Sequence, residues 1–480
     1  MKKFSFITLI TLLLWGNFTA CKKILEPEIF SQLTSNNFPK TEKDADLILT
    51  GFYSNFRHDW FGLYCAILPQ SWLYNSSRVT DEMVDFWSPD NTFNWGSGSF
   101  NGLFGYTPAI ARTTEFIETL NGSSLPAALK KSATAETKCI RAWLMFYLYD
   151  FYGPINVRLD PSKLADTTYS ARPTKAEYIG WMVKDLTEAM PDLLTRTNGT
   201  ASWGKVSKGL ASMLLMKIYM NDKQWDKAKS VAESIQSMGY VLNPSYKDVF
   251  IKEGNNEVVW ASPSGINVPS RHVPCSTPGD VAFLLGEKFD QGWGGQYMPW
   301  SFYDKFQPND KRLETIGSEY IATDGSVKKR NSADWGELWR GAIAMKGVLP
   351  YEKNRIGNFS TVAFRYADVL LSLAEIENEI NGPTATALAY VKQVTDRAGH
   401  IINPANLSSK DAFRTFLSDE RGRELYWEGW RRQDMIRLGT WLPWGISKGY
   451  NAQQKHLLFP ISPSIINESH GIIAQNAGYN

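Results

Sequence analysis

The stretch ERGRELYWEGWRRQDMIRLG, residues 420–439, combines a dense run of charge with large aromatic side chains. Acidic and basic residues recur in it three or four positions apart, in the pairs Glu420–Arg423, Glu428–Arg431, Glu428–Arg432 and Asp434–Arg437. Residues at this spacing are neighbours on a helix surface, and opposite charges there stabilise the helix. The pattern predicts a salt-bridged helix whose aromatic residues cover neighbouring helices, namely Tyr426, Trp427 and Trp430.

A second interpretation makes Glu424 and Glu428 the acid and base of a glycoside hydrolase. Retaining glycosidases need two carboxyl groups about 5–5.5 Å apart across a substrate cleft. A charged run on a helix is more often a salt-bridged or solvated face, so we favour the structural interpretation. The chain has no GxSxG, HExxH or GxxxxGK[ST] motif that would suggest other chemistry.

Helical patterns continue outward from this stretch. Residues 41–57, 106–120 and 172–194 space apolar side chains at helical intervals, and Thr41 and Thr174 begin two of them with capping patterns. Residues 137–154 are apolar on nearly every side, which predicts a central buried helix ended by Gly153 and Pro154.

Two longer stretches, 208–236 and 364–400, each predict a pair of helices joined by a short turn. Small residues alternate with large ones at helical spacing, as in tetratricopeptide repeats, where small side chains let antiparallel helices approach closely. Plain helical hairpins without repeat ancestry would give the same stability. The segment 241–360 differs, because it is rich in Gly, Pro, Asn and Ser and predicts loops with short strands.

The N-terminus predicts a signal peptide over residues 1–20. Lys2 and Lys3 precede an apolar stretch from Phe4 to Trp15, which is too short to span a bilayer as a helix. Small residues then lead to Cys21, where a lipoprotein signal would place its lipid-bearing thiol. An incidental cysteine in a plain secretory signal is the alternative, and we favour lipidation of Cys21.

Composition excludes several classes of protein. Removal of residues 1–20 lowers the formal net charge from +2 to zero, which favours neither nucleic acid nor an anionic surface as a partner. The five histidines are scattered, so a zinc site is not expected. The remaining cysteines, Cys65, Cys139 and Cys275, are far apart, and the sequence leaves any pairing among them open.

Several segments together resemble the SusD/RagB family of outer-membrane nutrient-binding lipoproteins. Residues 420–439 are similar to its motif E-R-x-R-E-L-x-x-E-G-x-R-x-x-D-[LM]-x-R-x-G, and FRYADVLLSLAEIENE (364–379) is similar to R-Y-A-[ED]-[VL]-L-L-x-x-A-E. The tail LFPISPSIINESHGIIAQNAGY (458–479) resembles the family's C-terminal motif, although Ala477 replaces its proline. IRAWLMFYLYDFYGPINV (140–157) resembles an N-terminal motif.

This resemblance implies a mostly α, SusD-like helical scaffold with tetratricopeptide-like helix pairs and a loop-rich ligand-binding lobe. The implied regions are 1–20 (signal peptide), 21–240 (N-terminal region) and 241–480 (C-terminal region with the loop-rich segment). The implied function is non-catalytic capture of oligosaccharide or polysaccharide at the outer membrane and delivery to a SusC-like TonB-dependent transporter. The RagB-type branch captures peptides instead, and a scaffold that holds another protein on its helices is a third alternative.

Two irregular aromatic segments, 71–100 and 287–306, predict the ligand site. Large rings offer contact area for the apolar faces of sugars, and nearby polar groups fix their orientation. The candidate ligand-binding residues are Trp95, Tyr297, Trp87, Trp293, Trp300, Asn91 and Asp81, of which Trp95 and Tyr297 are the first choices. Core packing is the alternative for each aromatic residue. No cofactor is expected, and the sequence leaves calcium open.

Overall fold

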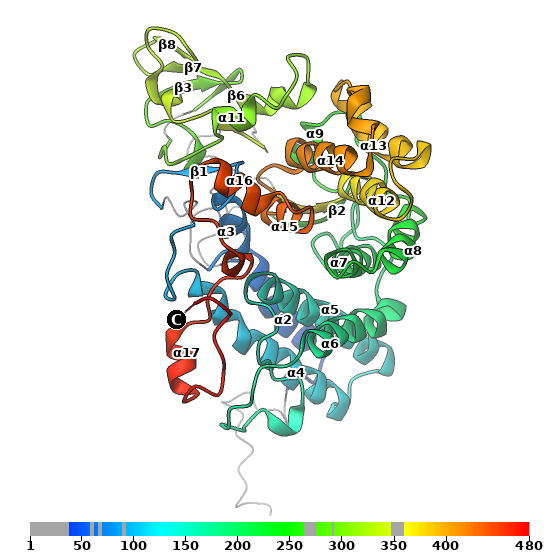
Figure 1. Cartoon of the computed structure of the whole chain (residues 1–480). Coiled ribbons are helices and arrows are strands. Elements are labelled where there is room, and N and C mark those ends of the chain that lie inside the picture. Colours follow the sequence, from blue (N-terminus) through cyan, green and yellow to red (C-terminus); the bar gives the residue numbers. More distant parts are fainter. Residues whose placement is uncertain are drawn as a thin grey trace, which may run out of the picture.

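The computed structural model describes residues 38–57, 62–65, 70–88, 93–263, 275–289, 292–346 and 360–479. The predicted signal peptide and Cys21 lie outside these residues. The fold is mostly helical, as predicted, and its strands form only small sheets. Figure 1 shows the helices forming the body of the molecule and β3, β7 and β8 lying together at one end. Over the described ranges, no helix is long and apolar enough to cross a membrane.

The N-terminal helices begin where the capping patterns predict. Thr41 and Thr174 form capping boxes with Asp44 and Glu177. The helices are α2 (Glu42–Tyr53), α3 (Trp72–Arg78), α4 (Thr107–Gly122), α5 (Ala127–Tyr152) and α6 (Lys175–Ala189). The central helix α5 starts at Ala127 rather than near residue 137, because the preceding Ala- and Lys-rich residues are strong helix formers. It ends at Gly153, which has a φ of 70°.

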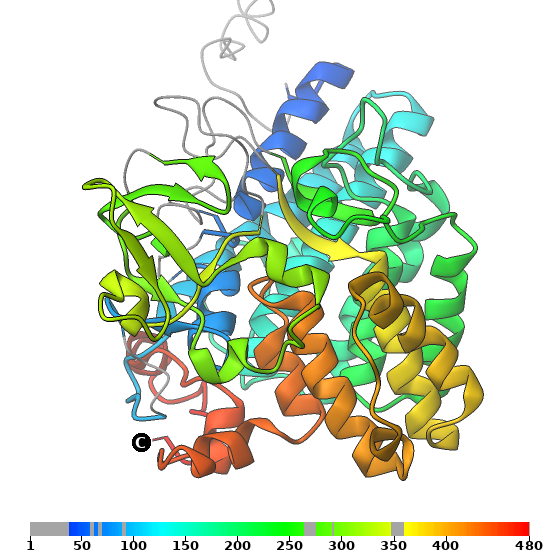
Figure 2. The same cartoon turned by 90° about the horizontal axis from the view of Figure 1, so that it is seen from above.

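The two predicted helix pairs are confirmed. The first is α7 (Lys208–Asn221) with α8 (Trp225–Gln236), and the second is α12 (Tyr366–Asn381) with α13 (Ala385–Ala398). Ala228 and Ala232 are fully buried on α8, as expected of small residues at a close helix contact. Helix α8 also packs against α12, so the two pairs are adjacent. Figure 2 shows them on the opposite side of the molecule from the four-stranded sheet.

Short strands join distant parts of the loop-rich segment, as the sequence predicts. The strands β4 (Glu287–Lys288), β3 (Val281–Leu284), β7 (Glu319–Ala322) and β8 (Val327–Lys329) form an antiparallel sheet in that order. Three two-stranded pairs accompany it: β1 (Val84–Asp85) with β5 (Gln296–Tyr297), β2 (Val258–Ser262) with β10 (Thr361–Arg365), and β6 (Ile316–Gly317) with β9 (Ile343–Ala344). The remaining helices are α9 (Asp248–Ile251), α11 (Trp300–Tyr303), α14 (Lys410–Leu425), α15 (Arg431–Arg437), α16 (Trp441–Ser447) and α17 (Pro463–Glu468).

The stretch 420–439 forms two helices rather than the single helix that its charge spacing predicts. Helix α14 ends at Leu425 and α15 begins at Arg431, because Trp427 and Gly429 take positive φ angles of 57° and 84°. A side chain at Gly429 would meet the Trp72 ring at 2.5 Å, so only glycine fits this break.

The break changes which of the predicted ion pairs form. Glu420–Arg423 and Asp434–Arg437 form within their helices at 2.7 Å each. The pairs predicted for Glu428 across the break are wrong. Glu428 instead contacts Arg365 and Lys346, whereas Arg431 pairs with Asp81 and Arg432 with Asp150.

Glu424 and Glu428 belong to a buried salt-bridge network centred on Arg365. This guanidinium donates to Glu257 at 2.9 Å, to Glu424 at 2.5 Å and to Glu428 at 2.8 Å. The two glutamates are 0% and 3% exposed. The network joins β10 and β2 to the end of α14 and the turn that follows it. Both carboxylates are occupied by arginine or lysine side chains, and the pocket that Glu428 lines has a volume of only about 40 Å³, which argues against the hydrolase interpretation.

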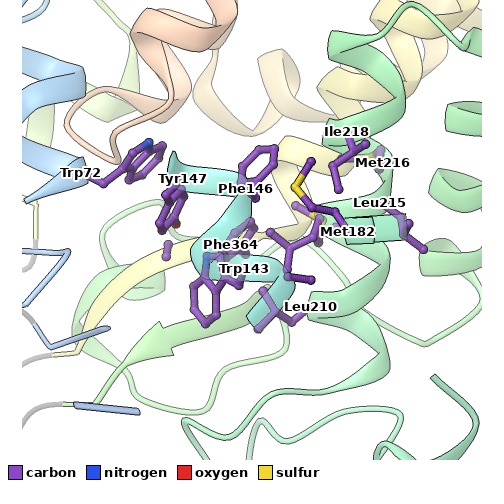
Figure 3. Packing of buried hydrophobic residues seen from close by; sticks show 14 of the residues in the cluster. Trp72, Trp143, Phe146, Tyr147, Met182, Leu210, Leu215, Met216, Ile218 and Phe364 are labelled. Atoms are coloured by element: carbon purple, nitrogen blue, oxygen red, sulfur yellow. The ribbon is translucent and has the colours of Figure 1, made fainter. Parts of the chain in front are cut away.

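The main hydrophobic core runs from α2 to the C-terminal tail. Figure 3 shows its centre, where Trp143, Tyr147 and Trp72 lie close together. The Trp72 and Tyr147 rings stack with centroids 4.1 Å apart, and Phe56 stacks on Trp143 at 3.9 Å. The prediction that Trp143 is a core residue is confirmed, since it is fully buried. The cysteines Cys65, Cys139 and Cys275 are also buried.

Candidate ligand-binding site

A short antiparallel ladder brings together the two aromatic segments that the sequence singles out. Val84 pairs with Tyr297 and Asp85 with Gln296. The backbone N–H of Phe86 continues the ladder by donating to the carbonyl of Gly295 at 2.8 Å. The residues just after β1 and just before β5 therefore lie side by side.

A third segment, residues 336–341, meets this ladder through the next residue, Ala342. The backbone of Met298 exchanges hydrogen bonds with that of Ala342 at 2.9 and 2.8 Å. The indole of Trp300 donates to the carbonyl of Leu338 at 2.8 Å. These bonds place the 3₁₀ turn Gly336–Trp339 against the start of the β5–α11 segment.

Exposed aromatic side chains gather where the three segments meet. Phe86, Trp87, Trp293 and Trp339 are 41%, 46%, 38% and 60% exposed, and we call these four residues the aromatic platform. The Phe86 and Trp339 rings are 5.5 Å apart and inclined at 70°. Exposed aromatic clusters of this kind mark interaction sites, because isolated domains rarely leave such surface open to water.

A polar pair lies among these rings. The Arg340 guanidinium is 5.0 Å from the centroid of Phe86 and 5.3 Å from that of Trp339. It pairs with Glu337 at 2.9 Å and donates to the carbonyl of Gly294, the residue after Trp293, at 3.2 Å. Both side chains are 27% exposed. The platform thus carries a donor and an acceptor that neutralise each other's charge.

Two glycines allow this close assembly. A Cβ at Gly295 would lie 2.2 Å from the Trp87 ring, and a Cβ at Gly294, whose φ is 55°, would lie 2.5 Å from the Glu337 carboxylate. Larger residues at either position would displace the platform or its polar pair. The glycines are therefore part of the site's construction.

Asp85 holds the turn that presents two of the platform residues. Its carboxylate is buried and accepts hydrogen bonds from the backbone N–H groups of Trp87 at 2.7 Å and Ser88 at 3.0 Å. Its other oxygen accepts from the Tyr74 hydroxyl at 2.5 Å and from Gln296 at 3.3 Å. One side chain therefore ties the turn to α3 and to β5.

The structure places Trp87 and Trp293 at the surface, on the platform, and Trp300 just behind it. Trp300 is half-buried, with the Arg330 guanidinium 4.2 Å from its ring centroid, and it supports the 336–341 segment. The ligand roles of these three residues stay predictions.

The expectation that Trp95 and Tyr297 offer exposed rings is wrong. Trp95 is 6% exposed, and its indole donates to the Tyr479 hydroxyl at 2.9 Å. Its Gly and Asn neighbours do indicate a loop, but that loop packs beneath the C-terminal tail. Tyr297 is fully buried behind Phe86, and its hydroxyl donates to Glu337 at 2.6 Å. Burial, and then the Glu337 charge, raise the pKa of that hydroxyl.

Asp81 is also buried, and it lies in an ion cluster rather than on the platform. Arg431 contacts it at 2.6 and 2.8 Å, and Lys305 at 2.9 Å. Burial alone raises the pKa of Asp81, but the charges of Arg431 and Lys305 outweigh it and lower the pKa below its ordinary value. These contacts indicate that Asp81 has a structural role. Asn91 lies outside the described residues.

Sequence reasoning missed Phe86, Trp339, Arg340 and Glu337. The signal that selected Trp293, an aromatic residue beside glycine in an irregular segment, also applies to Trp339, two residues before Gly341. Phe86 stands directly before Trp87, inside one of the two aromatic segments. Glu337 and Arg340 stand three positions apart, the spacing of an ion pair on one helical turn, but a single such pair does not mark a site.

The sequence is similar to that of SusD-like proteins. Residues 256–479 match the model of the SusD family. A SusD-like protein of Formosa agariphila is 28% identical over 350 residues, which cover 64% of this chain and 64% of that protein, just under two thirds. A second SusD-like protein of the same organism is 23% identical over 474 residues, covering 91% of this chain and 92% of that one.

Solved structures share the fold. A laminarin-binding SusD-like protein superposes with a TM-score of 0.75 at 19% identity, over 92% of this chain and 100% of that one. Surface glycan-binding protein A from Bacteroides thetaiotaomicron, solved with laminarihexaose, gives a TM-score of 0.70 at 19% identity, over 90% of this chain and 99% of that one. The predicted mostly α, SusD-like scaffold is therefore confirmed.

Proposed function

The chain belongs to the SusD family, and we propose that it binds oligosaccharide or polysaccharide on the aromatic platform. The observation that carries this proposal is the gathering of Phe86, Trp87, Trp293 and Trp339 at the surface beside the Glu337–Arg340 pair. The protein acts as a capture protein and not as an enzyme.

The chemistry of the platform suits a sugar. A pyranose ring has apolar C–H faces that pack on aromatic rings, and hydroxyl groups around its edge that need donors and acceptors. Trp339 and Phe86 supply the rings, whereas Arg340 and Glu337 supply a donor and an acceptor. Two structural neighbours support this ligand class, because one is described as laminarin-binding and the other was solved with laminarihexaose.

The charge of the site favours a neutral glycan. The Arg340 charge is balanced by Glu337, and the Tyr297 hydroxyl and the backbone N–H of Gly279 hold the Glu337 carboxylate in place while leaving it acceptor capacity. Binding by stacking and hydrogen bonding depends little on ionic strength, because no net charge is neutralised.

The rest of the proposed role follows from the sequence and the family. A lipid on Cys21 tethers the body to the outer membrane, with its binding face outward. The captured glycan then passes to a SusC-like TonB-dependent transporter. The order of basic residues, apolar stretch, small residues and Cys21 supports the lipid anchor.

Alanine substitution on the platform tests the proposal. Trp339→Ala removes the most exposed ring of the platform. Aromatic anchors that a ligand covers on binding contribute about 2 kcal/mol or more. We expect affinity for the best ligand in a panel of neutral oligosaccharides, laminarihexaose included, to fall more than tenfold, since about 1.4 kcal/mol is a factor of ten. Isothermal titration calorimetry measures the change.

Phe283→Ala is the matched control. Phe283 is 43% exposed on β3, in the four-stranded sheet, and is not one of the platform residues. Its loss should leave affinity unchanged, and Trp339→Phe should retain most of it. Unchanged affinity in Trp339→Ala would place the ligand elsewhere. Binding of peptides but of no glycan would favour the peptide-capturing branch.

A further inference from the structure

A large cleft lies well away from the aromatic platform. Residues 154–173, which we call the arch, run from the end of α5 to the start of α6 and enclose a cleft of about 1310 Å³ with α4, α5, α6 and the C-terminal residues 461–473. None of its lining residues belongs to the platform. Figure 1 shows α4 and α17 at the opposite end of the molecule from β3, β7 and β8.

The arch is fixed at its base rather than loose. Arg172 donates to the carbonyls of Tyr152 and Pro154 at 2.7 Å each and to the side chain of Asn476 at 2.8 Å. These bonds tie both feet of the arch to each other and to the C-terminal tail. The cleft is therefore present before any ligand arrives.

Two further bonds hold the sides of the arch. The Asn156 amide spans it by donating to the carbonyls of Ser170 and Ala171 at 2.9 and 3.0 Å. The Thr114 hydroxyl of α4 donates to the carbonyl of Arg158 at 2.7 Å. A preformed frame of this kind avoids part of the entropy that ordering a loop on binding would lose.

The charges in the cleft are balanced in number, and those of its helical wall are paired. Six basic and six acidic side chains line it. On its helical wall, Arg141 meets Asp185 through two bonds of 2.7 Å, and Lys138 meets Glu188 at 2.7 Å. Paired side chains hold their remaining donors and acceptors in fixed positions but exert little net field. This wall suits a polar, uncharged ligand.

Three isoleucines of the lining offer almost no surface to a ligand. Ile155, Ile461 and Ile473 are only 4%, 0% and 7% exposed. Val157, Leu159, Leu164 and Ile465 are half-buried, so the cleft also offers short apolar edges beside its polar wall. The accessible ring is Tyr169 of the arch, which is 42% exposed, and Trp181 of α6 lines the same cleft half-buried.

We propose that the arch cleft is a second binding site for a neutral, hydroxyl-rich oligosaccharide, with Tyr169 as its stacking ring. The inference rests on the proposed function for the class of ligand, but its site is independent of the platform. A polysaccharide held at both sites would dissociate more slowly than from either alone, because the second contact is intramolecular.

Hydrogen exchange of the full chain locates the bound sugar. The protein is saturated in turn with each neutral oligosaccharide of the panel, laminarihexaose included, and amide exchange is followed by mass spectrometry. We expect slower exchange both in residues 336–341 of the platform and in residues 154–173 of the arch. Protection of the platform alone would overturn the second site and leave the proposed function intact.

Other outcomes are equally decisive. Protection of the arch alone would support the second site and remove the platform from the proposed function. Protection of neither would overturn both. Protection of the arch by a pool of peptides, but by no sugar, would overturn the ligand class proposed for the cleft.

Substitution of Tyr169 separates stacking from general effects. In a Trp339→Ala background, Tyr169→Ala should weaken the remaining binding at least tenfold and abolish protection of the arch. Tyr169→Phe keeps the ring and should retain both, and Phe283→Ala should change neither. Equal binding by the Tyr169→Ala and Tyr169→Phe variants would show that no sugar stacks there.

Discussion

The indole of Trp95 donates a hydrogen bond to the hydroxyl of Tyr479 at 2.9 Å, across 384 positions of the chain. Phe93 stacks on Trp95 with centroids 5.3 Å apart, and Phe100 meets its edge at the same distance. The C-terminal tail thus closes over an aromatic loop of the N-terminal region. Trp95 therefore joins two distant segments of the chain, and its buried ring is not available for a ligand to stack on.

Truncation of Trp95 should therefore affect stability and not binding. Trp95→Ala removes a buried ring, so we expect the free energy of unfolding to fall by about 3–5 kcal/mol. The fraction that remains folded should bind glycan as the wild type does. Urea unfolding and calorimetry measure the two quantities. Trp339→Ala is the reciprocal control, since its exposed ring should matter to binding and hardly to unfolding. A weakened affinity with unchanged stability in Trp95→Ala would contradict this assignment.

The buried network at Arg365 predicts a loss of stability in acid. Burial alone raises the pKa of Glu424, but the charges of Arg397, Arg365 and Arg312 outweigh it and hold the pKa well below its ordinary value. A carboxyl whose pKa is lowered by folding stabilises the protein above its unfolded pKa of about 4.3, and this stabilisation is lost as pH falls toward the folded pKa.

Between about pH 5 and about pH 3, which spans the ordinary carboxyl pKa, the free energy of unfolding should fall with pH in both proteins. We expect it to fall more steeply in the wild type than in Glu424→Gln. Glu424→Ala should cost about 3–5 kcal/mol at neutral pH, because it leaves buried arginines uncompensated. Denaturant unfolding at several pH values provides the test. Parallel pH profiles for wild type and Glu424→Gln would refute the role of this carboxylate.

Glu82 predicts the opposite pH dependence. Its carboxyl is fully buried, and no ion pair reaches it within the described ranges. Burial raises its pKa to about 8, although Arg431 nearby opposes the rise and Asp81 adds to it. Because folding raises this pKa, the stability it confers is complete below the unfolded pKa and is lost as pH rises through about 8.

Glu82→Gln mimics the protonated acid and should remove this loss. We expect the variant to equal the wild type near pH 3, below the unfolded pKa of about 4.3, and to be more stable near pH 8, on the order of 1 kcal/mol for each unit of pKa shift. Glu42→Gln, on the exposed side of α2, should change neither value. A Glu82→Gln variant that is less stable than the wild type at pH 8 would show that the charged form has an essential partner.

Cys21 predicts a lipid anchor. Residues 2–21 present basic residues, an apolar stretch, small residues and the cysteine in that order. Cys21→Ala expressed in an outer-membrane-bearing host should be soluble and should incorporate no radioactive palmitate, whereas the wild type should be labelled and sediment with membranes. Cys65→Ala is a control that keeps Cys21. A labelled, membrane-bound Cys21→Ala variant would rule out this attachment site.

Local patterns predicted the helices because their causes are local. Capping residues such as Thr41 and Thr174 fix helix starts, and alanines such as Ala228 and Ala232 fix close helix contacts. The break in residues 420–439 could not be predicted, because it depends on Trp72, which packs against Gly429 from a distant helix. Spacing alone gave the ion pairs on either side of the break but not those across it.

The site was predictable only in part, for the same reason. Its two loops stood out by composition, and both contribute platform residues, Trp87 and Trp293. Their meeting depends on a ladder of two residue pairs between positions more than 200 apart, which has no sequence signature. Burial depends on which face of such a short strand meets the core, so Tyr297 turns inward while Phe86 remains exposed.

Asp85 should control binding without touching the ligand. Its carboxylate accepts four hydrogen bonds that hold the turn bearing Phe86 and Trp87, as described above. Asp85→Asn keeps the shape but turns one acceptor into a donor, which faces either the backbone N–H groups or the amide N–H of Gln296. A buried donor left without a partner costs about 1–3 kcal/mol, and a shift of the turn relieves it.

We therefore expect Asp85→Asn to weaken glycan binding about tenfold or more, since about 1.4 kcal/mol is a factor of ten, while the protein stays folded. The quenching of tryptophan fluorescence by acrylamide reports the position of Trp87 directly and should change even without ligand. A variant that only loses stability would leave quenching and affinity of the folded fraction unchanged. That outcome would make Asp85 a structural residue and leave the platform to be held by the Glu337–Arg340 pair and the two glycines.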